Sequence, residues 1–395
     1  MTSSDNTALY REALDLVAAK TLEDENSIGA AFPYVTHPDG SWDLMSSAVS
    51  AGYTGENWDH GNWFCGFWVG LLLAAHLHTK DKRYLDLAHD RMVLVAERAD
   101  DGNTHDIGFI FLSSALPFHR MTQSVRCREL GLRAADKLRS RLIVTRKGAY
   151  VSSWGPLDDP RGQASSAIDT MANIPLLYWA ATESGDASFR LAGEAHAKMT
   201  MAAFRRPDAT LYHAVEYDTV SGDRLRGYTF QGYGDESAWS RGTGWAVYGL
   251  AASAAASGDA SYLDQAIELA EKWFAQLGGK TVPAYDFDAP SGDAPEDSSA
   301  SAIMAAALLD LASLHPDPAI GDQWNAKAHH LLAGLCADYL ALAPSHRGIL
   351  KHGCYSKPHN KGADAAVMFG DYFFVEALMR VLKPGDFVPS LKRLK

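Results

Sequence analysis

The stretch S-G-D-A-S-Y-L-D-Q-A, residues 257–266, ends one apolar segment and begins another whose apolar residues recur three and four apart. Close copies are S-G-D-A-S-F-R-L-A at 184–192 and T-K-D-K-R-Y-L-D-L-A at 79–88, with looser copies at 122–130 and 315–328. Each clear copy places turn and capping residues before an aromatic residue, which is typical of a short turn between two antiparallel helices. We interpret these copies as helical hairpins.

Helical spacing of apolar residues extends along almost the whole chain, and runs with strand-like alternation are few. The pattern predicts about twelve helices, near 7–24, 63–78, 83–98, 106–120, 124–142, 169–183, 187–204, 237–256, 260–276, 297–314, 320–340 and 369–383. Little charge is carried by five of them, which are 63–78, 169–183, 237–256, 297–314 and 369–383. A helix that is apolar on all sides belongs inside a fold, and an amphipathic helix belongs outside. An all-α fold, an (α/α)6 barrel of six helical hairpins in two rings, satisfies this alternation.

The length of 395 residues and a hydrophobic content of 47% are enough for two average domains or for one large closed core. No Pro/Gly/Ser-rich linker and no block of charge separates two halves of the sequence. We therefore expect a single domain over residues 1–395.

Charge and cysteine usage exclude several classes of protein. The net charge of -12 argues against a nucleic-acid binder, which would need a basic face. No apolar run is long enough to span a membrane, and the first residues lack the pattern of a secretory signal. The four cysteines lie far apart without a C-x-x-C motif, which favours buried free thiols. We expect a soluble cytoplasmic protein with no metal, because no His/Asp/Glu set has ligand spacing, and with no cofactor, nucleic-acid or membrane partner.

Unusual polar and aromatic residues precede the predicted inner helices, in loops that two concentric rings would bring to one end of the barrel. These residues are Trp58, Trp63, His105, Asp106, Trp154, Asp169, His213, Gln231, Trp239, Arg241, Trp245, Asp297 and Ser298, and the basic stretch 346–361 follows them. Tryptophan rings beside carboxylates are typical of a sugar site, because the C–H faces of sugars stack on indoles and paired acids transfer protons. The set indicates carbohydrate chemistry.

Two aspartates are the candidates for the reaction itself. Asp106 stands in T-H-D-I-G-F-I-F (104–111), and Asp169 stands in A-I-D-T-M-A-N-I-P (167–175). Both precede a predicted helix, so each could simply be an N-cap, and for Asp106 taken alone this is the more common role. A carboxylate among the apolar neighbours of Asp169 is costly without a purpose. We expect the two side chains to face each other across one tryptophan-walled site.

Structural alternatives exist for the other candidates as well. His105 and His213 could be ordinary loop histidines, and the tryptophans could belong to the core. Arg241 could be the ion-pair partner of Asp235 or Glu236. The basic stretch 346–361, with seven Lys, Arg or His residues and no acid, could be a solvated surface loop.

Five longer phrases carry a resemblance to a known family. They are H-D-I-G-F (105–109), A-I-D-T-M-A-N-I-P-L-L-Y-W-A (167–180), Q-G-Y-G-D-E-S-A-W-S-R-G-T-G-W-A-V-Y-G (231–249), E-D-S-S-A-S-A-I (296–303) and F-G-D-Y-F-F-V-E-A-L (369–378). From about Trp58 to Leu382 the chain resembles glycoside hydrolase family 88, the unsaturated glucuronyl hydrolases, whose fold is the same barrel. The resemblance implies removal of a 4,5-unsaturated uronic acid from the non-reducing end of lyase-generated oligosaccharides, by hydration of the C4=C5 vinyl ether.

The same resemblance implies roles for particular residues. Asp169 corresponds to the family's general acid/base, and Asp106 to the second aspartate, which holds the sugar hydroxyls. Burial and the nearby Asp106 are expected to raise the pKa of Asp169. Substrate contacts are expected from His105, Trp63, Trp154, His213, Gln231, Trp239, Arg241 and Trp245, with Arg241 or His213 holding the uronate carboxylate. Ser356 and Lys357 are expected to contact the second sugar or its sulfate.

Other functions fit part of the sequence. The alternatives are a related barrel enzyme acting on unsaturated rhamnogalacturonan fragments and a sugar-binding barrel without catalysis. The expected partner is an unsaturated uronate-containing oligosaccharide, and we expect a monomer or a weak homodimer.

Overall fold

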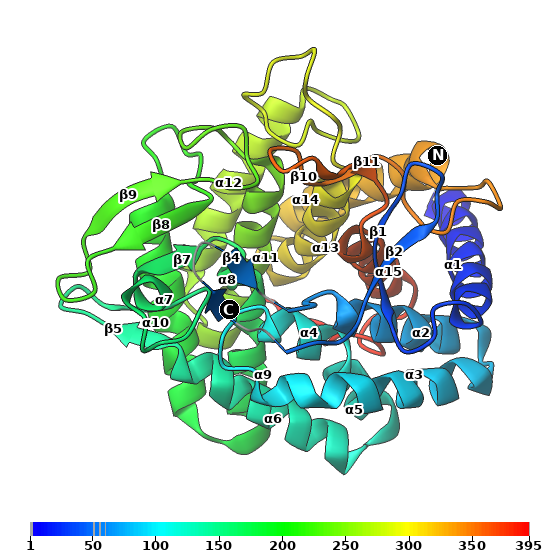
Figure 1. Cartoon of the computed structure of the whole chain (residues 1–395). Coiled ribbons are helices and arrows are strands. Elements are labelled where there is room, and N and C mark those ends of the chain that lie inside the picture. The colour runs from blue at the N-terminus through cyan, green and yellow to red at the C-terminus, as the bar shows by residue number, and fades with distance from the viewer. Residues whose placement is uncertain (1–2, 50–51, 55–56, 60, 395) are drawn as a thin grey trace.

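Two concentric rings of helices make up the fold of the chain, in a computed structural model that describes residues 3–49, 52–54, 57–59 and 61–394 (Figure 1). The inner ring contains α2 (Cys65–Thr79), α4 (Ile107–Ser113) continued by α5 (Ala115–Thr122), α8 (Thr170–Asn173) continued by α9 (Pro175–Ser184), α11 (Ser240–Ser257), α13 (Ser298–Leu314) and α15 (Met368–Leu382). The outer ring contains α1 (Ser3–Glu25), α3 (Lys82–Val95), α6 (Val125–Ser140), α10 (Ala187–Phe204), α12 (Ala260–Leu277) and α14 (Pro318–Gly334). Each inner helix packs on the next, and the ring closes where α15 meets α2. The predicted (α/α)6 barrel is confirmed. The side chain of Trp58 lies outside the described residues.

The repeated turn phrase makes the same structure in its three clear copies. In each copy the first helix ends at a residue in the left-handed conformation, and the next residue is an aspartate that caps the second helix. The left-handed residues are Lys80, Gly185 and Gly258, at φ 63°, 77° and 73°, and the capping residues are Asp81, Asp186 and Asp259. This combination reverses the chain in a very short turn.

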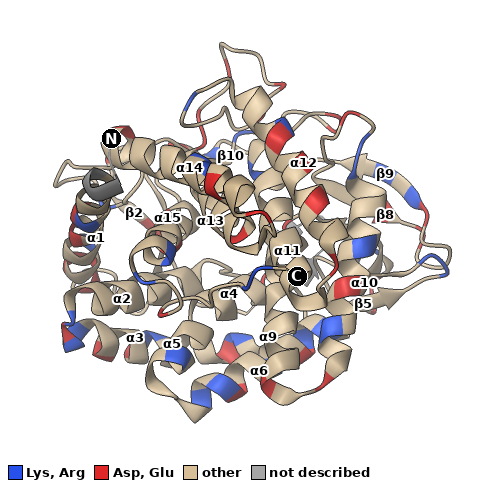
Figure 2. Ribbon diagram, turned by 180° about the vertical axis from the view of Figure 1, so that it is seen from behind, with Lys and Arg blue, Asp and Glu red and all other residues tan. Residues whose placement is uncertain are grey.

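The inner helices are apolar and the outer helices carry the charge. Every residue is buried from Cys65 to Ala75 in α2 and from Met368 to Met379 in α15. In Figure 2, α2 and α4 are drawn almost wholly in tan, whereas α3, α6 and α12 carry coloured charged residues. The five charge-poor helices are inner helices as predicted, and the sixth is formed by α4 and α5.

Two predicted helices are each broken into two pieces. The helix predicted at 106–120 breaks at Ser114, and the one at 169–183 breaks at Ile174. Pro117 and Pro175 are the cause, because proline lacks the N–H of the helical ladder and its ring collides with the carbonyl four residues earlier. The helices predicted at 83–98 and 320–340 each continue into a short turn of another helical type, at Ala96–Asp100 and Leu335–Tyr339. The remaining predicted helices have single counterparts.

Short strands decorate the loops, more often than the sequence suggested. The described residues include eleven strands in five small sheets. They are β1 (Phe32–Thr36) with β2 (Trp42–Met45), β3 (Gly52–Thr54) with β4 (Asn57–Asp59), β5 (Leu142–Val144) with β6 (Ala149–Val151), β7 (Ser165–Ala167) with β8 (Ala214–Tyr217) and β9 (Arg224–Tyr228), and β10 (Gly353–Ser356) with β11 (Lys361–Ala365). Three short helical turns, at Ala96–Asp100, Pro160–Ala164 and Leu335–Tyr339, complete the structure. Strands of three to five residues are too short for alternation to reveal them.

Glycines set the spacing of the inner ring. A Cβ on Gly66 of α2 would collide with the carbonyl oxygen of Ile110 in α4, and a Cβ on Gly249 of α11 would collide with that of Met171 in α8. Neighbouring inner helices therefore touch backbone to backbone. This close approach packs the inner helices tightly against one another.

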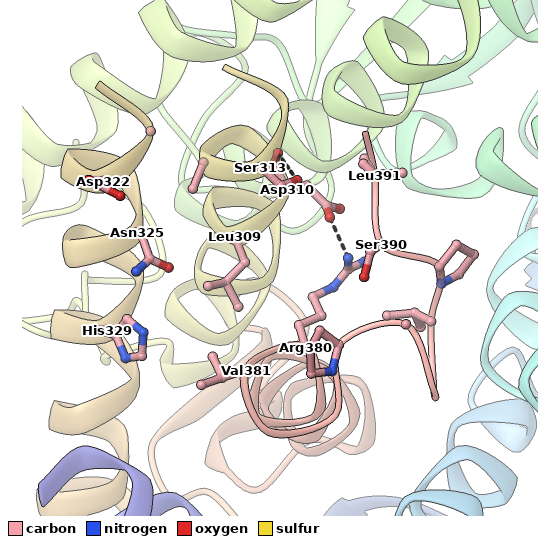
Figure 3. A pocket seen from close by; sticks show the side chains of 16 residues that line it. Leu309, Asp310, Ser313, Asp322, Asn325, His329, Arg380, Val381, Ser390 and Leu391 are labelled. Carbon is pink, nitrogen blue, oxygen red and sulfur yellow. Dashed lines mark hydrogen bonds and ion pairs between the residues drawn. The ribbon is translucent and has the colours of Figure 1, made fainter. Parts of the chain in front are cut away.

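A cavity of about 410 Å³ lies at the other end of the barrel (Figure 3). It is lined by the last turns of α13 and α15, by α14 and by residues 384–391, and Arg380 pairs with Asp310 at 2.5 Å inside it. None of the predicted site residues lines this cavity, because they lie near the beginnings of the inner helices or in the loops and short strands that lead into them.

Candidate active site

Asp106 and Asp169 occupy equivalent positions in the barrel. Each is the residue directly before an inner helix, α4 or α8, and neither side chain caps its helix. By contrast, six other aspartates of the described chain that precede helices each accept the expected backbone N–H, namely Asp81, Asp159, Asp186, Asp259, Asp297 and Asp317. The capping bond that the structural alternative requires is therefore absent at both candidate positions.

One asparagine ties the two helix starts together. The Oδ1 atom of Asn173 accepts the N–H of Phe109 at 2.6 Å, and its Nδ2 donates to the carbonyl of Asp169 at 3.0 Å. Gly108 leaves room for this contact, because a Cβ there would meet Asn173. The bridge brings Asp106 and Asp169, which are distant in the sequence, to the same part of the barrel.

His105 lies between the two aspartates. Its Nε2 is 2.9 Å from Asp106 Oδ1, and its Nδ1 is 3.2 Å from the hydroxyl of Thr170, the residue after Asp169. The other oxygen of Asp106 accepts from Thr104 Oγ1 at 3.0 Å. His105 is buried and bonded on both ring nitrogens, so it is not an ordinary loop histidine.

Asp169 has the electrostatic setting of a proton donor. Burial raises its pKa to about 6; the charge of Asp106 also raises it, whereas His105 and Arg241 lower it. The direction and both causes agree with the expectation from sequence. The side chain keeps 14% of its surface exposed, and that of Asp106 keeps 8%. A carboxyl with such a pKa is partly protonated near neutrality and can donate its proton.

His213 faces Asp169 from the opposite side. Its Nε2 is 3.8 Å from Asp169 Oδ2, which is too far for a hydrogen bond, and neither buried atom has a partner among the described residues. Its Nδ1 is 2.9 Å from Thr229 Oγ1, and its ring packs between Phe230 and Trp239. Burial, then the charges of Arg241 and His105, hold the pKa of His213 well below its usual value. The imidazole is therefore neutral at physiological pH.

Two of the four predicted tryptophans pack on these polar groups, and Trp63 lies among aromatic rings beside Tyr355. The backbone of Trp154 forms an isolated β-bridge with Thr104, and its ring centroid is 5.5 Å from that of His105. The ring centroid of Trp239 is 4.1 Å from that of His213. Trp63 stacks on Phe369 at 5.4 Å. Trp245 lies deeper and is fully buried against Phe109, which is the place expected of a core tryptophan.

Arg241 is held by protein groups on every terminal N–H. Its Nη1 pairs with Asp297 and donates to the carbonyl of Cys354 at 2.6 Å. Its Nη2 donates to Gln231 Oε1 at 2.9 Å and to the carbonyl of Tyr355 at 2.7 Å. The bond from Arg241 fixes the amide oxygen of Gln231, so the opposite end of that amide is its donor end.

The suggested pairing of Arg241 with Asp235 or Glu236 is wrong. Asp235 accepts the N–H of Thr229 at 2.8 Å, and Glu236 accepts from the hydroxyl of Tyr212 at 3.3 Å. The partner of Arg241 is Asp297 because the first turn of α11 packs beside the start of α13.

Two tyrosines belong to the site although the sequence did not single them out. The ring of Tyr355 lies edge-on to that of Tyr34 with centroids 5.5 Å apart, and its centroid is 6.4 Å from that of Trp63. Burial, together with the charge of Asp106, raises the pKa of its hydroxyl. Tyr355 stands directly before the predicted contacts Ser356 and Lys357, a signal that could have drawn attention to it. Tyr34 lies in the short strand β1, outside every motif.

Ser356 and Lys357 lie on the β10–β11 hairpin and already have protein partners. Ser356 Oγ is 2.7 Å from His359 Nδ1, and Lys357 Nζ is 2.6 Å from Asp293. Other basic residues of the stretch 346–361 are also paired with acids, Arg347 with Glu23 and Asp24, and His352 with Asp364. The basic stretch is therefore not simply a solvated loop.

The remaining expectations concern metals, membranes and thiols. Within the described ranges, no three His, Cys, Asp or Glu side chains are grouped to hold a metal ion, and no helix is both long and apolar enough to cross a bilayer. The four cysteines are buried free thiols, as predicted.

The chain is similar in sequence and structure to several known proteins, although no model of a protein family matches it. The chain is 30% identical over 379 residues to the unsaturated glucuronyl hydrolase of Bacillus sp. strain GL1, covering 94% of this chain and 97% of that protein. It is 30% identical over 332 residues to the unsaturated chondroitin disaccharide hydrolase of Streptococcus agalactiae serotype III strain NEM316, covering 82% of each. A solved structure of a UGL variant with dGlcA-Glc-Rha-Glc superposes with a TM-score of 0.87 at 29% identity, covering 95% of this chain and 97% of that one.

Proposed function

The chain belongs to the unsaturated glucuronyl hydrolases, glycoside hydrolase family 88, and we propose that Asp169 and Asp106 carry out its reaction. The enzyme is a glycosidase that removes the 4,5-unsaturated uronic acid from the non-reducing end of lyase-generated oligosaccharides. It does so by hydrating the vinyl ether and not by attacking the anomeric carbon. The rule that relates carboxylate separation to stereochemistry therefore does not apply.

The observation that carries the proposal is the environment of Asp169, whose pKa of about 6 suits a proton donor. Asp169 protonates C4 of the double bond, and the positive charge that develops is shared between C5 and the ring oxygen. Water adds at C5 and returns a proton to Asp169. The resulting hemiketal opens by breaking the bond from C5 to the ring oxygen, and the hemiacetal left at C1 expels the aglycone as an alcohol.

Asp106 holds the sugar hydroxyls and supports the developing positive charge. Its contacts with His105 and Thr104 fix its orientation. Its negative charge also helps Asp169 to keep a proton before the reaction, since two nearby carboxylates resist ionising together.

His213 and Gln231 are the proposed donors to the uronate carboxylate or to the attacking water. An unpartnered buried polar atom is costly, and a substrate or water oxygen that contacts both His213 Nε2 and Asp169 Oδ2 removes that cost. The terminal N–H groups of Arg241 are engaged elsewhere, so we assign its positive charge a supporting role behind Gln231. Trp63, Trp154 and Trp239 supply the apolar walls.

The proposed substrate is an unsaturated disaccharide from a glycosaminoglycan or a related acidic polysaccharide. A relative's name specifies chondroitin disaccharide. Ser356 and Lys357 would contact the second sugar from the β10–β11 hairpin. A cytoplasmic location and a monomeric or weakly dimeric state stay predictions from the sequence.

The test is the ultraviolet absorbance of the double bond conjugated to the carboxylate. Incubation with unsaturated chondroitin or gellan disaccharides should abolish it, and rhamnogalacturonan fragments serve as the competing substrate. Asp169→Asn should bind the disaccharide without turning it over. Absorbance that persists with every lyase product would reject the hydrolase function, and faster loss with rhamnogalacturonan fragments would favour the sister activity.

A further inference from the structure

Asp297 is a fully buried carboxylate that joins three elements of the barrel end. Its Oδ2 pairs with Arg241 in α11. Its Oδ1 accepts the N–H and the hydroxyl of Ser299 in α13 and, at 3.2 Å, the N–H of Cys354 in β10. The capping bond to Ser299 explains only part of this arrangement, because the second oxygen is used for the ion pair.

The ion pair holds two groups that border the aspartates. Arg241 binds the side-chain oxygen of Gln231 and the carbonyl of Tyr355. The ring of Tyr355 extends from that backbone to Trp63, Tyr34 and the neighbourhood of Asp106. Moving the guanidinium would therefore shift both Gln231 and Tyr355.

The ion pair of Arg241 and Asp297 also sets how strongly the positive charge of Arg241 acts on Asp169. Arg241 lowers the pKa of both Asp169 and His213. Its guanidinium is buried, so solvent screens it weakly, and the carboxylate of Asp297 is the countercharge in direct contact. Without that countercharge the full positive charge would favour ionised Asp169. The other charged or titratable groups that face Asp169 are His105, Asp106 and His213.

We propose that Asp297 is a positioning residue for the reaction, which orients and neutralises Arg241 so that Gln231 and Tyr355 stay in place and Asp169 remains able to donate a proton. The inference rests on the proposed role of Asp169. If Asp297 had a purely structural role, its replacement would lower the stability of the protein and leave the pH dependence of the reaction unchanged.

The first variant is Asp297→Asn, which keeps the size of the side chain and an oxygen for the cap of α13. We expect the basic limb of the kcat/KM profile to move about one pH unit lower, because the uncompensated Arg241 favours the ionised form of Asp169. At pH values above the basic limb, kcat/KM of the variant should be about tenfold lower than that of the parent enzyme. The matched control is Asp259→Asn, which makes the same substitution at the capping position of α12 and should leave the limb unmoved.

Two variants of Arg241 separate charge from geometry. Arg241→Gln removes the cation, so the limb should move to higher pH, while the lost contacts lower kcat. Arg241→Lys keeps the positive charge but loses the hydrogen bonds of the planar guanidinium. We therefore expect kcat to fall and the basic limb of the pH profile to stay at the same pH. These variants test the inference even if Asp297→Asn does not fold.

The outcomes are distinguishable. A parent enzyme that leaves the ultraviolet absorbance unchanged contradicts the proposed function. An active parent whose pH limb stays fixed in folded Asp297→Asn, or in Arg241→Gln, overturns the role of Asp297 alone.

Discussion

Asn173 Oδ1 accepts the backbone N–H of Phe109 at 2.6 Å, and this contact between α8 and α4 is what sets the two aspartates of the site beside each other. The same side chain donates to the carbonyl of Asp169. The separation of Asp106 from Asp169 therefore depends on a buried amide that takes no part in the proposed chemistry.

Replacing this amide should harm both stability and catalysis. Asn173→Ala leaves the N–H of Phe109 buried without a partner, which costs about 1–3 kcal/mol of unfolding free energy. We also expect kcat to fall about tenfold or more, since misplacing catalytic groups by an ångström is expensive. Thermal unfolding and the absorbance assay measure the two effects. Full kcat in a folded variant would show that the bridge is not needed to align the aspartates.

Asp169→Asn should lose turnover by orders of magnitude and gain stability at neutral pH. The pKa of this carboxyl is raised from 3.8 to about 6 on folding, so ionisation above pH 6 opposes the folded state. The amide removes a penalty of about 1–3 kcal/mol.

The sign of this effect fixes its pH window. The folded state holds the proton of Asp169 more tightly than the unfolded state does. The loss of unfolding free energy caused by ionised Asp169 is therefore absent below about pH 4, grows as pH rises, and is complete above about pH 6. Urea unfolding of both proteins at pH 4 and pH 7.5 measures the difference. A stability gap that is equal at the two pH values would contradict the raised pKa.

Asp106→Asn should also lose turnover by orders of magnitude, while its fold persists. The side chain makes no capping bond to α4, so its replacement removes no cap from that helix. Circular dichroism and the absorbance assay give the two readouts. An unfolded variant would instead support a structural role for Asp106.

Gly249→Ala should destabilise the barrel by more than about 2 kcal/mol, because the added Cβ meets the backbone oxygen of Met171 and neither helix can retreat. Gly292→Ala is the matched control, since nothing lies within 4 Å of a Cβ at that position. Chemical unfolding compares the two. Equal stability would show that α8 and α11 can separate without loss.

Asp293→Asn should improve the use of sulfated disaccharides. Lys357 is paired with Asp293 at 2.6 Å, so removing the acid frees the ammonium for an anionic group on the second sugar. We expect kcat/KM to rise about three- to tenfold for a sulfated disaccharide and to change little for an unsulfated one. Lys357→Ala should abolish the gain, and a gain that survives in the double variant would place the sulfate elsewhere.

Sequence by itself determined the barrel, and it supplied the two aspartates of the proposed site. The turn phrase encodes a left-handed stop followed by a capping aspartate, and the absence of charge marks the inner helices; both are local signals. The motifs around Asp106 and Asp169 carried the family resemblance. The breaks at Ser114 and Ile174 were also encoded locally, by Pro117 and Pro175, but were not predicted.

Tertiary structure alone decided how the site is assembled. The partner of Arg241 is Asp297, not the nearby Asp235 or Glu236, and Tyr34 reaches Tyr355 from the far end of the chain. The physical reason is that periodicity and capping act over a few residues, whereas a buried charge or hydroxyl pairs with whatever group the closed ring brings within hydrogen-bond distance. Which helix starts meet is decided only when the barrel closes.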